Sequence, residues 1–241
     1  MNPDLGTVEF DVPEVFEEFR ATDDPEEAYE LVLDPLGARA AELGTDRRRA
    51  LTDLHLTGSA ALSGLDAIWS GTCVGTLDGR PSTATLTVVQ LETADPAPQE
   101  AVAAALSEIL APAPETAGGR GHRRLVRRFE APAGPVVVAL EQTPGWQLGD
   151  GQSVPLLSAK AHLPLPPPLA GVLLVELTTP GVDHWADDYA PLLVAVLRSV
   201  RFGAADAQDA PTGPAADRGP VASGGTGAGT SGTDPFGTVL V

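Results

Sequence analysis

The stretch VPLLSAKAHLPLPPPLAGVLLVELTTP, residues 154–180, decides the fold of this chain. Two aliphatic segments flank a connection that holds four prolines between residues 164 and 168. Proline cannot donate a hydrogen bond to a neighbouring strand, so regular pairing has to stop at this connection. The pattern predicts two antiparallel strands joined by a proline-rich turn.

Two further segments show the same hairpin pattern. In DAIWSGTCVGTLDGRPSTATLTVVQLE, residues 66–92, β-rich arms flank the pair Asp78-Gly79, which suits the positive φ angles of a tight turn. In RRLVRRFEAPAGPVVVALEQT, residues 123–143, a second turn is expected at residues 132–135. Residues 6–12 alternate apolar and polar side chains and predict one more strand.

Helices are expected between these strands. Asp24 can cap a helix that begins at Pro25, and Glu27 would complete a capping box. A second helix is predicted over residues 36–43 and would end at Gly44, and residues 46–56 are also helical in pattern. An alanine-rich helix is predicted within residues 97–110.

Residues 183–203 form the strongest amphipathic pattern in the chain. Trp185, Tyr189, Leu192 and Val196 recur at helical spacing, although Pro191 places the start of this helix in doubt. Together the elements predict an α+β fold, in which an antiparallel sheet built from hairpins is covered by helices. The predicted organisation is one domain over residues 1–202, a disordered linker rich in Gly, Ala and Pro over residues 203–232, and a short linear motif over residues 233–241.

The charge of the chain excludes some partners. The net charge is −18, and residues 1–53 hold 15 acidic against 5 basic residues. Such a field repels nucleic acid and anionic membrane surfaces, so we expect neither as a partner. No apolar run approaches the length of a membrane span, and the first residues lack the features of a secretory signal. We therefore expect a cytoplasmic protein, with export through a specialised machine as the alternative; the preference for Arg over Lys indicates a bacterial origin.

The second half of the chain resembles the Mog1/PsbP-like fold family in its actinobacterial versions. The resemblance is carried by GPVVVALEQ, by LLSAKAHLPLPPPLAGVLLVELTTP, and by WADDYAPLLVAVLRSVRF, and it is strongest over residues 125–202. It implies a binding module, since family members act as assembly factors, as binders of small GTPases and as chaperones or accessory proteins of secretion systems. It brings no shared catalytic residues.

No motif in the sequence predicts an enzyme. The chain has no G-x-S-x-G, P-loop or H-E-x-x-H pattern, and Gly227-x-Gly229-x-x-Gly232 lacks the preceding strand and following helix of a dinucleotide site. The histidines have no metal-ligand spacing; His184 and Asp188 could share a helix face, but helix capping explains the acids there better. The lone Cys73 fits a small buried hydrophobe. We expect no catalytic residue, no metal and no cofactor.

One basic cluster stands out in this acidic chain. The cluster could bind a phosphate or an acidic segment of a partner. The alternative is a strand whose arginine side chains stay solvated or pair with the acidic first fifth of the chain. The candidate residues are Arg120, Arg123, Arg124, Arg127 and Arg128.

The last residues form the second candidate for binding. After a segment of about 30 residues with an r.m.s. span of about 30 Å, apolar residues return at the very end. They could add a strand to a partner's sheet, fill an apolar groove, or fold back on the chain's own sheet. The alternative is a terminus without function. The candidate residues are Asp234, Pro235, Phe236, Val239, Leu240 and Val241.

These observations predict a non-catalytic, protein-binding module with a tethered docking peptide, an accessory or chaperone-like factor of a bacterial secretion or assembly system. The alternative is a cargo or effector protein that its C-terminal peptide recruits to a shell or an export machine. A structural subunit that associates with itself is a third hypothesis.

Overall fold

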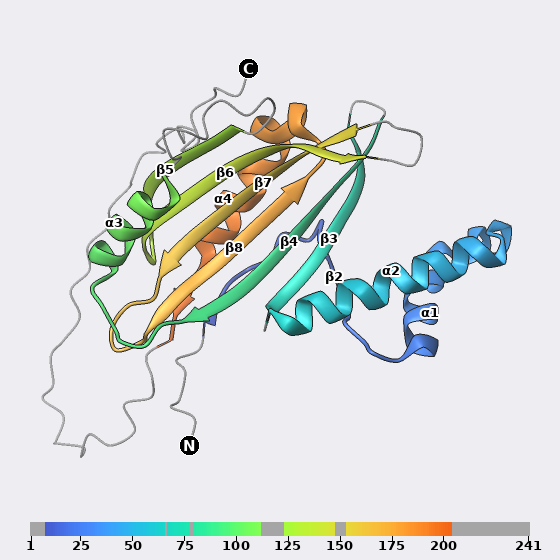
Figure 1. Cartoon of the computed structure of the whole chain (residues 1–241), viewed down its shortest axis with the longest axis horizontal. Helices are drawn as coiled ribbons and strands as arrows, with labels where there is room; N and C mark the ends of the chain where they lie inside the picture. Colours follow the sequence, from blue (N-terminus) through green and yellow to red (C-terminus); the bar gives the residue numbers. More distant parts are fainter. Residues whose placement is uncertain (1–7, 66, 78–79, 112–122, 148–152, 204–241) are drawn as a thin grey trace, which may run out of the picture.

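A computed structural model describes residues 8–65, 67–77, 80–111, 123–147 and 153–203 of the chain. Its centre is an antiparallel sheet with the strand order β2-β3-β4-β8-β7-β6-β5 (Figure 1). The strands are β2 (Glu17–Glu18), β3 (Ala67–Leu77), β4 (Arg80–Glu92), β8 (Gly171–Thr179), β7 (Ser153–Pro164), β6 (Gly134–Gln147) and β5 (Arg123–Ala131). The predicted α+β class is confirmed.

The three predicted hairpins form the body of this sheet. Leu163 pairs with Leu173 across β7 and β8, so the proline-rich connection joins the two strands as expected. Leu77 pairs with Arg80 beside the predicted Asp78-Gly79 turn, whose two residues lie outside the described part. Ala131 pairs with Gly134, which places the third turn at Pro132 and Ala133. The hairpins join side by side because β4 pairs with β8 and β6 pairs with β7.

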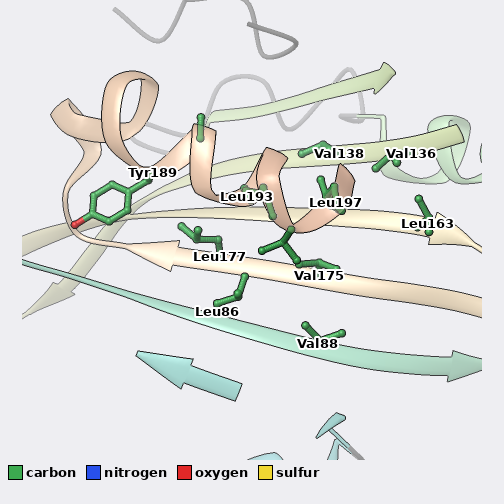
Figure 2. Close-up of a cluster of buried hydrophobic side chains, with 14 of the residues drawn as sticks. Leu86, Val88, Val136, Val138, Leu163, Val175, Leu177, Tyr189, Leu193 and Leu197 are labelled. Atoms are coloured by element: carbon green, nitrogen blue, oxygen red, sulfur yellow. The ribbon is translucent and has the colours of Figure 1, made fainter. Parts of the chain in front are cut away.

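Helix α4 (Ala190–Ser199) covers one face of the sheet. Its buried Leu193 and Leu197 point at the sheet, where the alternate residues of four strands supply Leu86, Val138, Leu163 and Val175 among others (Figure 2). Each buried aliphatic side chain of this kind contributes about 1.5–3 kcal/mol relative to its exposure. This face is the hydrophobic core.

The other face of the sheet is only partly covered. Helix α3 (Gln99–Leu110) packs on it over β5, β6 and β7, where Val137 and Ala139 are fully buried (Figure 1). The Gln99 side-chain amide donates to the carbonyl oxygens of Ala133 (3.0 Å) and Pro164 (2.7 Å), which fixes the start of the helix against both turns. Beyond α3 this face carries polar side chains such as Thr87, Lys160 and Glu176, together with the apolar pair Val89 and Leu174.

The N-terminal helices project from the β2 and β3 side of the sheet (Figure 1). Helix α1 (Pro25–Leu33) begins as predicted: Asp24 caps it by accepting from the Glu26 amide at 2.8 Å, and Pro25 opens it. The predicted capping box, in which Glu27 would accept from the Asp24 amide, is wrong. The Asp24 amide donates to the Thr22 hydroxyl oxygen, and the Thr22 hydroxyl donates to the Glu27 carboxylate.

The helix predicted over residues 36–43 was also wrong in type. Asp34–Glu42 forms 3-10 turns (η1) with a kink at Gly37, where φ is 50°. Gly44 does not end a helix; it precedes α2 (Thr45–Gly64), which is longer than the predicted 46–56. Propensity alone could not set these boundaries, because α1 and α2 are held mainly by each other.

The remaining corrections concern the two ends of the described chain. Within the described part of the strand predicted at residues 6–12, only β1 (Val8–Glu9) is a strand, and it pairs with β9 (Arg201–Phe202) apart from the main sheet; residues 6 and 7 lie outside the described part. The long C-terminal helix opens with a 3-10 turn (η3, Val182–His184) and a π-turn (η4, Trp185–Tyr189). Pro191 then lies in the first turn of α4, where its missing N–H needs no partner. The predicted linker and C-terminal motif lie outside the described residues.

Candidate functional site

The basic cluster lies on β5, the edge strand of the sheet. All nine residues from Arg123 to Ala131 pair with β6, and within the described part of the chain no strand pairs with the outer side of β5. The outer side therefore keeps unpaired backbone N–H and C=O groups, which is the usual template for adding a strand. Arg120 lies outside the described residues.

The strand places its four arginines on two faces. Side chains alternate along a strand, so Arg123 and Arg127 share the face of Leu125 and Phe129, which pack at the rim of the core. Arg124 and Arg128 point to the face that α3 partly covers, as their ion pairs there show. The cluster does not converge on one point, so it does not form a compact anion pocket.

Ion pairs within the chain occupy the second pair of arginines. Arg124 Nε lies 2.8 Å from Glu141 Oε1 on β6. Arg128 binds Glu100 on α3 and lies 3.6 Å from Glu130; the hydrogen bond to Glu100 raises the pKa of Arg128. The alternative that the arginines stay solvated or pair with the acidic first fifth of the chain is wrong for Arg124 and Arg128, whose partners Glu141 and Glu100 lie in other parts of the chain. Neither Arg123 nor Arg127 has a carboxylate partner among the described residues, and Arg127 donates to its neighbour's carbonyl on Val126.

The ion pair of Arg124 continues as a polar network across the open part of the sheet. Lys160 Nζ lies 3.6 Å from Glu141 Oε2 and 3.9 Å from Glu176 Oε1. Ser158 donates to Glu176 at 2.6 Å. In this network each of the two carboxylates has a cation or a hydroxyl group beside it. We therefore interpret the network as a structural feature of the sheet surface. Sequence reasoning missed it; the signal was the alternation that places polar residues at Ser158, Lys160 and His162 of β7 and at Glu176 and Thr178 of β8.

One pocket of about 310 Å³ lies where α2 meets β2 and β3. It is open and has a mixed polar and apolar lining, in which Glu18 is the one titratable side chain. Beside it Phe19 stacks on His55 with ring centroids 4.4 Å apart, and the His55 Nε2 lies 2.9 Å from the Arg20 carbonyl oxygen. The other lining residues are Phe19, Ala21, Leu62, Ser63, Ala67, Ile68, Trp69 and Ser70.

The remaining titratable candidates are held by structural contacts. His184 Nδ1 lies 3.4 Å from Asp188 Oδ2, so the two share one face as predicted, but the described residues contain no group of three or more metal-ligand side chains. Cys73 packs against the core from β3, and burial raises the pKa of its thiol. His162 lies on β7, where burial lowers its pKa. The glycine motif at residues 227–232 and the residues of the C-terminal candidate lie outside the described part.

Neither the known protein families nor the curated proteins include a match to this chain. The resemblance to the Mog1/PsbP-like family stays a prediction. In the described part of the chain, no helix is both long enough and apolar enough to cross a membrane.

Proposed function

We propose that this chain is a non-catalytic protein-binding module, and that the outer side of β5 receives an extended acidic segment of a partner protein. The observation that supports this is the unpaired edge of β5 in the described structure, which carries two arginines without a carboxylate partner in a chain of net charge −18. Strand addition draws its affinity from backbone hydrogen bonds and its selectivity from the side chains that flank the new strand.

The arginines define what the added segment should carry. Arg123 and Arg127 lie on the same face of β5 and are four residues apart, which corresponds to about 13 Å along a strand. A partner segment with two acidic residues four positions apart can place one carboxylate opposite each guanidinium. The same charges repel a second β5 strand, since like charges opposite one another destabilise a sheet. The charges of the β5 edge therefore favour pairing with an acidic strand and disfavour pairing with a second β5 strand.

Binding of a defined peptide tests this proposal. The probe is a fluorescent nine-residue peptide of alternating threonine and valine with glutamates at its third and seventh positions, and its control carries glutamines there. We expect Arg127→Glu to weaken binding by about 10-fold or more, because it removes an attraction and adds a repulsion. Arg198→Glu, at an exposed position in the last turn of α4, makes the same charge change away from the edge and should leave binding unchanged. If both variants lost the same peptide affinity, the effect would come from the net charge of the protein alone. That result would contradict a binding site at the β5 edge.

The C-terminal segment is the second part of this proposal. We place residues 233–241 as a docking peptide for a larger assembly, because four apolar residues end a segment that is otherwise polar. A pull-down from host lysate with the full chain and with a chain ending at Gly232 tests it. A protein captured by the full chain alone supports the docking peptide; the same proteins from both would contradict it and leave the β5 edge as the sole candidate.

The wider role that fits both parts is an accessory or chaperone-like factor of a bacterial secretion or assembly system. Its support is the family resemblance of residues 125–202. A factor of this kind needs a site for an extended client segment and a means of recruitment, which the β5 edge and the C-terminal segment would supply.

A further inference from the structure

The outer edge of β5 has a side-chain pattern that another segment of the same chain matches. On the face at the rim of the core, arginine and apolar side chains alternate along β5: Arg123, Leu125, Arg127 and Phe129. The two apolar side chains are half-buried there, and the two arginines are exposed. A strand that is added along this edge therefore needs a polar partner for each arginine and an apolar residue between them.

Residues 234–240, which lie outside the described part, carry the matching alternation. In DPFGTVL every second residue from Asp234 is in turn acidic, apolar, hydroxyl-bearing and apolar. A parallel register that sets Asp234 opposite Arg123 brings all four positions of this face into step. The pairs are Asp234 with Arg123, Phe236 with Leu125, Thr238 with Arg127, and Leu240 with Phe129.

The acidic residue of the segment sets the direction of this pairing. An antiparallel register also brings the apolar residues of the two segments together, but it places Asp234 opposite Ala131 and next to the acidic Glu130. The parallel register places the same carboxylate opposite the exposed guanidinium of Arg123. Opposite charges across two strands stabilise the pair and like charges destabilise it, so the parallel register is favoured.

Pro235 suits the outermost position that the added strand would take. Neighbouring residues of a strand direct their backbone groups to opposite sides, so a strand that bonds to β5 through residues 236, 238 and 240 turns Pro235 away from it. Proline has no N–H group, and strands accept it where that position faces solvent. It also disfavours the pairing of a further strand on the new edge.

The connection is long enough for this pairing within one chain. Thirty residues, rich in Gly, Ala and Pro, separate Gly203 from Asp234. A chain of that length reaches about 100 Å at full extension, and about 30 Å as the r.m.s. span of a Gly-rich linker. Helix α4, which precedes Gly203, contacts β8, and three strand spacings of about 14 Å in all separate β8 from β5. Every position along β5 is therefore within reach.

We propose that residues 234–240 occupy the β5 edge of their own chain as an added parallel strand. This inference rests on the proposed function, since it concerns the same edge, and it names how that edge is regulated. The chain's own segment offers one carboxylate to the two arginines, whereas a partner segment with acidic residues four positions apart offers two. A partner therefore displaces the segment and at the same time releases it for docking.

Disulfide cross-linking of the full chain tests the register. On a Cys73→Ala background, Arg123→Cys/Asp234→Cys should form a disulfide within a monomer on mild oxidation, because opposite residues of paired strands lie about 5 Å apart, within disulfide range. Ala131→Cys/Asp234→Cys, which only the antiparallel register brings together, is the matched control and should stay reduced. A disulfide in the control pair would overturn the parallel register. A disulfide-linked dimer, or no disulfide in either pair, would overturn pairing within one chain.

Peptide binding to the full chain separates this inference from the proposed function. Phe236→Ser/Leu240→Ser removes both apolar contacts of the segment, so the acidic nine-residue peptide should bind about 3–10-fold more tightly, which corresponds to an edge that is about 10–30% free in the original chain. Val239→Ser/Val241→Ser removes two apolar side chains from the opposite face of the segment. This matched control should change the affinity by less than about twofold.

The outcomes of this experiment are distinct for the two proposals. Unchanged affinity in Phe236→Ser/Leu240→Ser, or an equal gain in the matched control, would overturn the parallel strand. If Arg127→Glu still weakened peptide binding in that case, the β5 edge would remain a binding site that the chain itself leaves open. If neither the original chain nor Phe236→Ser/Leu240→Ser bound the peptide, the proposed function would fail, and this inference would fail with it.

Discussion

Arg124 on β5 and Glu141 on β6 are direct cross-strand partners, and their side chains form an ion pair of 2.8 Å. Three residues further along the same strand, Arg127 has no such partner among the described residues. The two arginines therefore have different roles in our account: Arg124 belongs to the sheet, and Arg127 is available to a ligand.

The two arginines should therefore contribute differently to the free energy of unfolding. The side chains of Arg124 and Glu141 are 36% and 26% exposed, so their pair should contribute about 0.2–1 kcal/mol. We expect a double-mutant cycle with Arg124→Ala and Glu141→Ala, followed by urea unfolding, to give a coupling in that range. Arg127→Ala should leave the free energy of unfolding unchanged. A larger cost for Arg127 than for Arg124 would show that Arg127 is structural.

Tyr189 and Ser82 form a hydrogen bond inside the protein, which joins the start of α4 to β4. Tyr189→Phe leaves the buried Ser82 hydroxyl without this partner and should lower the free energy of unfolding by about 1–2 kcal/mol. Adding Ser82→Ala removes the unpaired group, so the double variant should be less destabilised than the sum of the single variants. Chemical unfolding measures this, and simple additivity would show that the bond contributes nothing.

Gly171 begins β8 with φ at 147°, and a Cβ there would collide with the Leu91 carbonyl oxygen. Gly171→Ala should therefore cost about 2 kcal/mol or more, because both the strained backbone and the clash act against it. Gly75 on β3 has open space around it, so Gly75→Ala is the matched control and should change stability by less than about 0.5 kcal/mol. Thermal unfolding distinguishes the two, and equal effects would contradict the close approach of β8 to β4.

Burial lowers the pKa of His162, and the nearby charges of Lys160 and Arg124 act in the same direction. Below the ordinary histidine pKa of about 6.5 the unfolded chain takes up a proton that the folded chain resists, so stability must fall as the pH drops. We expect the original chain to lose more stability between pH 7.5 and pH 5.5 than His162→Gln, which cannot titrate. Parallel pH profiles for the two would contradict the buried, neutral histidine.

The sequence predicted those parts of the fold that local chemistry determines. The proline-rich connection, Asp78-Gly79 and the Asp24-Pro25 start all act within a few residues, and strands or helices begin and end beside them as expected. The 3-10 turns around Gly37 and the pairing of β1 with β9 were missed, because they depend on contacts between distant segments. Pro191 signalled an irregular start of α4 but could not specify a π-turn.

The candidate site was predicted in composition but not in arrangement. The arginine-rich segment was found from its residues, and its position at the sheet edge follows only from the strand order. The sequence does not show which face of the sheet each arginine takes, because this depends on the register of β5 against β6. It does not show the ion pairs with Glu141 and Glu100 either, because these depend on that register and on the position of α3.

The most direct test of the central claim is amide hydrogen exchange of β5 with and without the acidic nine-residue peptide. An added strand would form hydrogen bonds with the outward-facing amides of Arg123–Ala131, so their exchange should slow when the peptide binds, while α4 stays unchanged. The Arg127→Glu variant should show no such protection at the same peptide concentration. Binding of the peptide without protection along β5 would contradict strand addition at this edge.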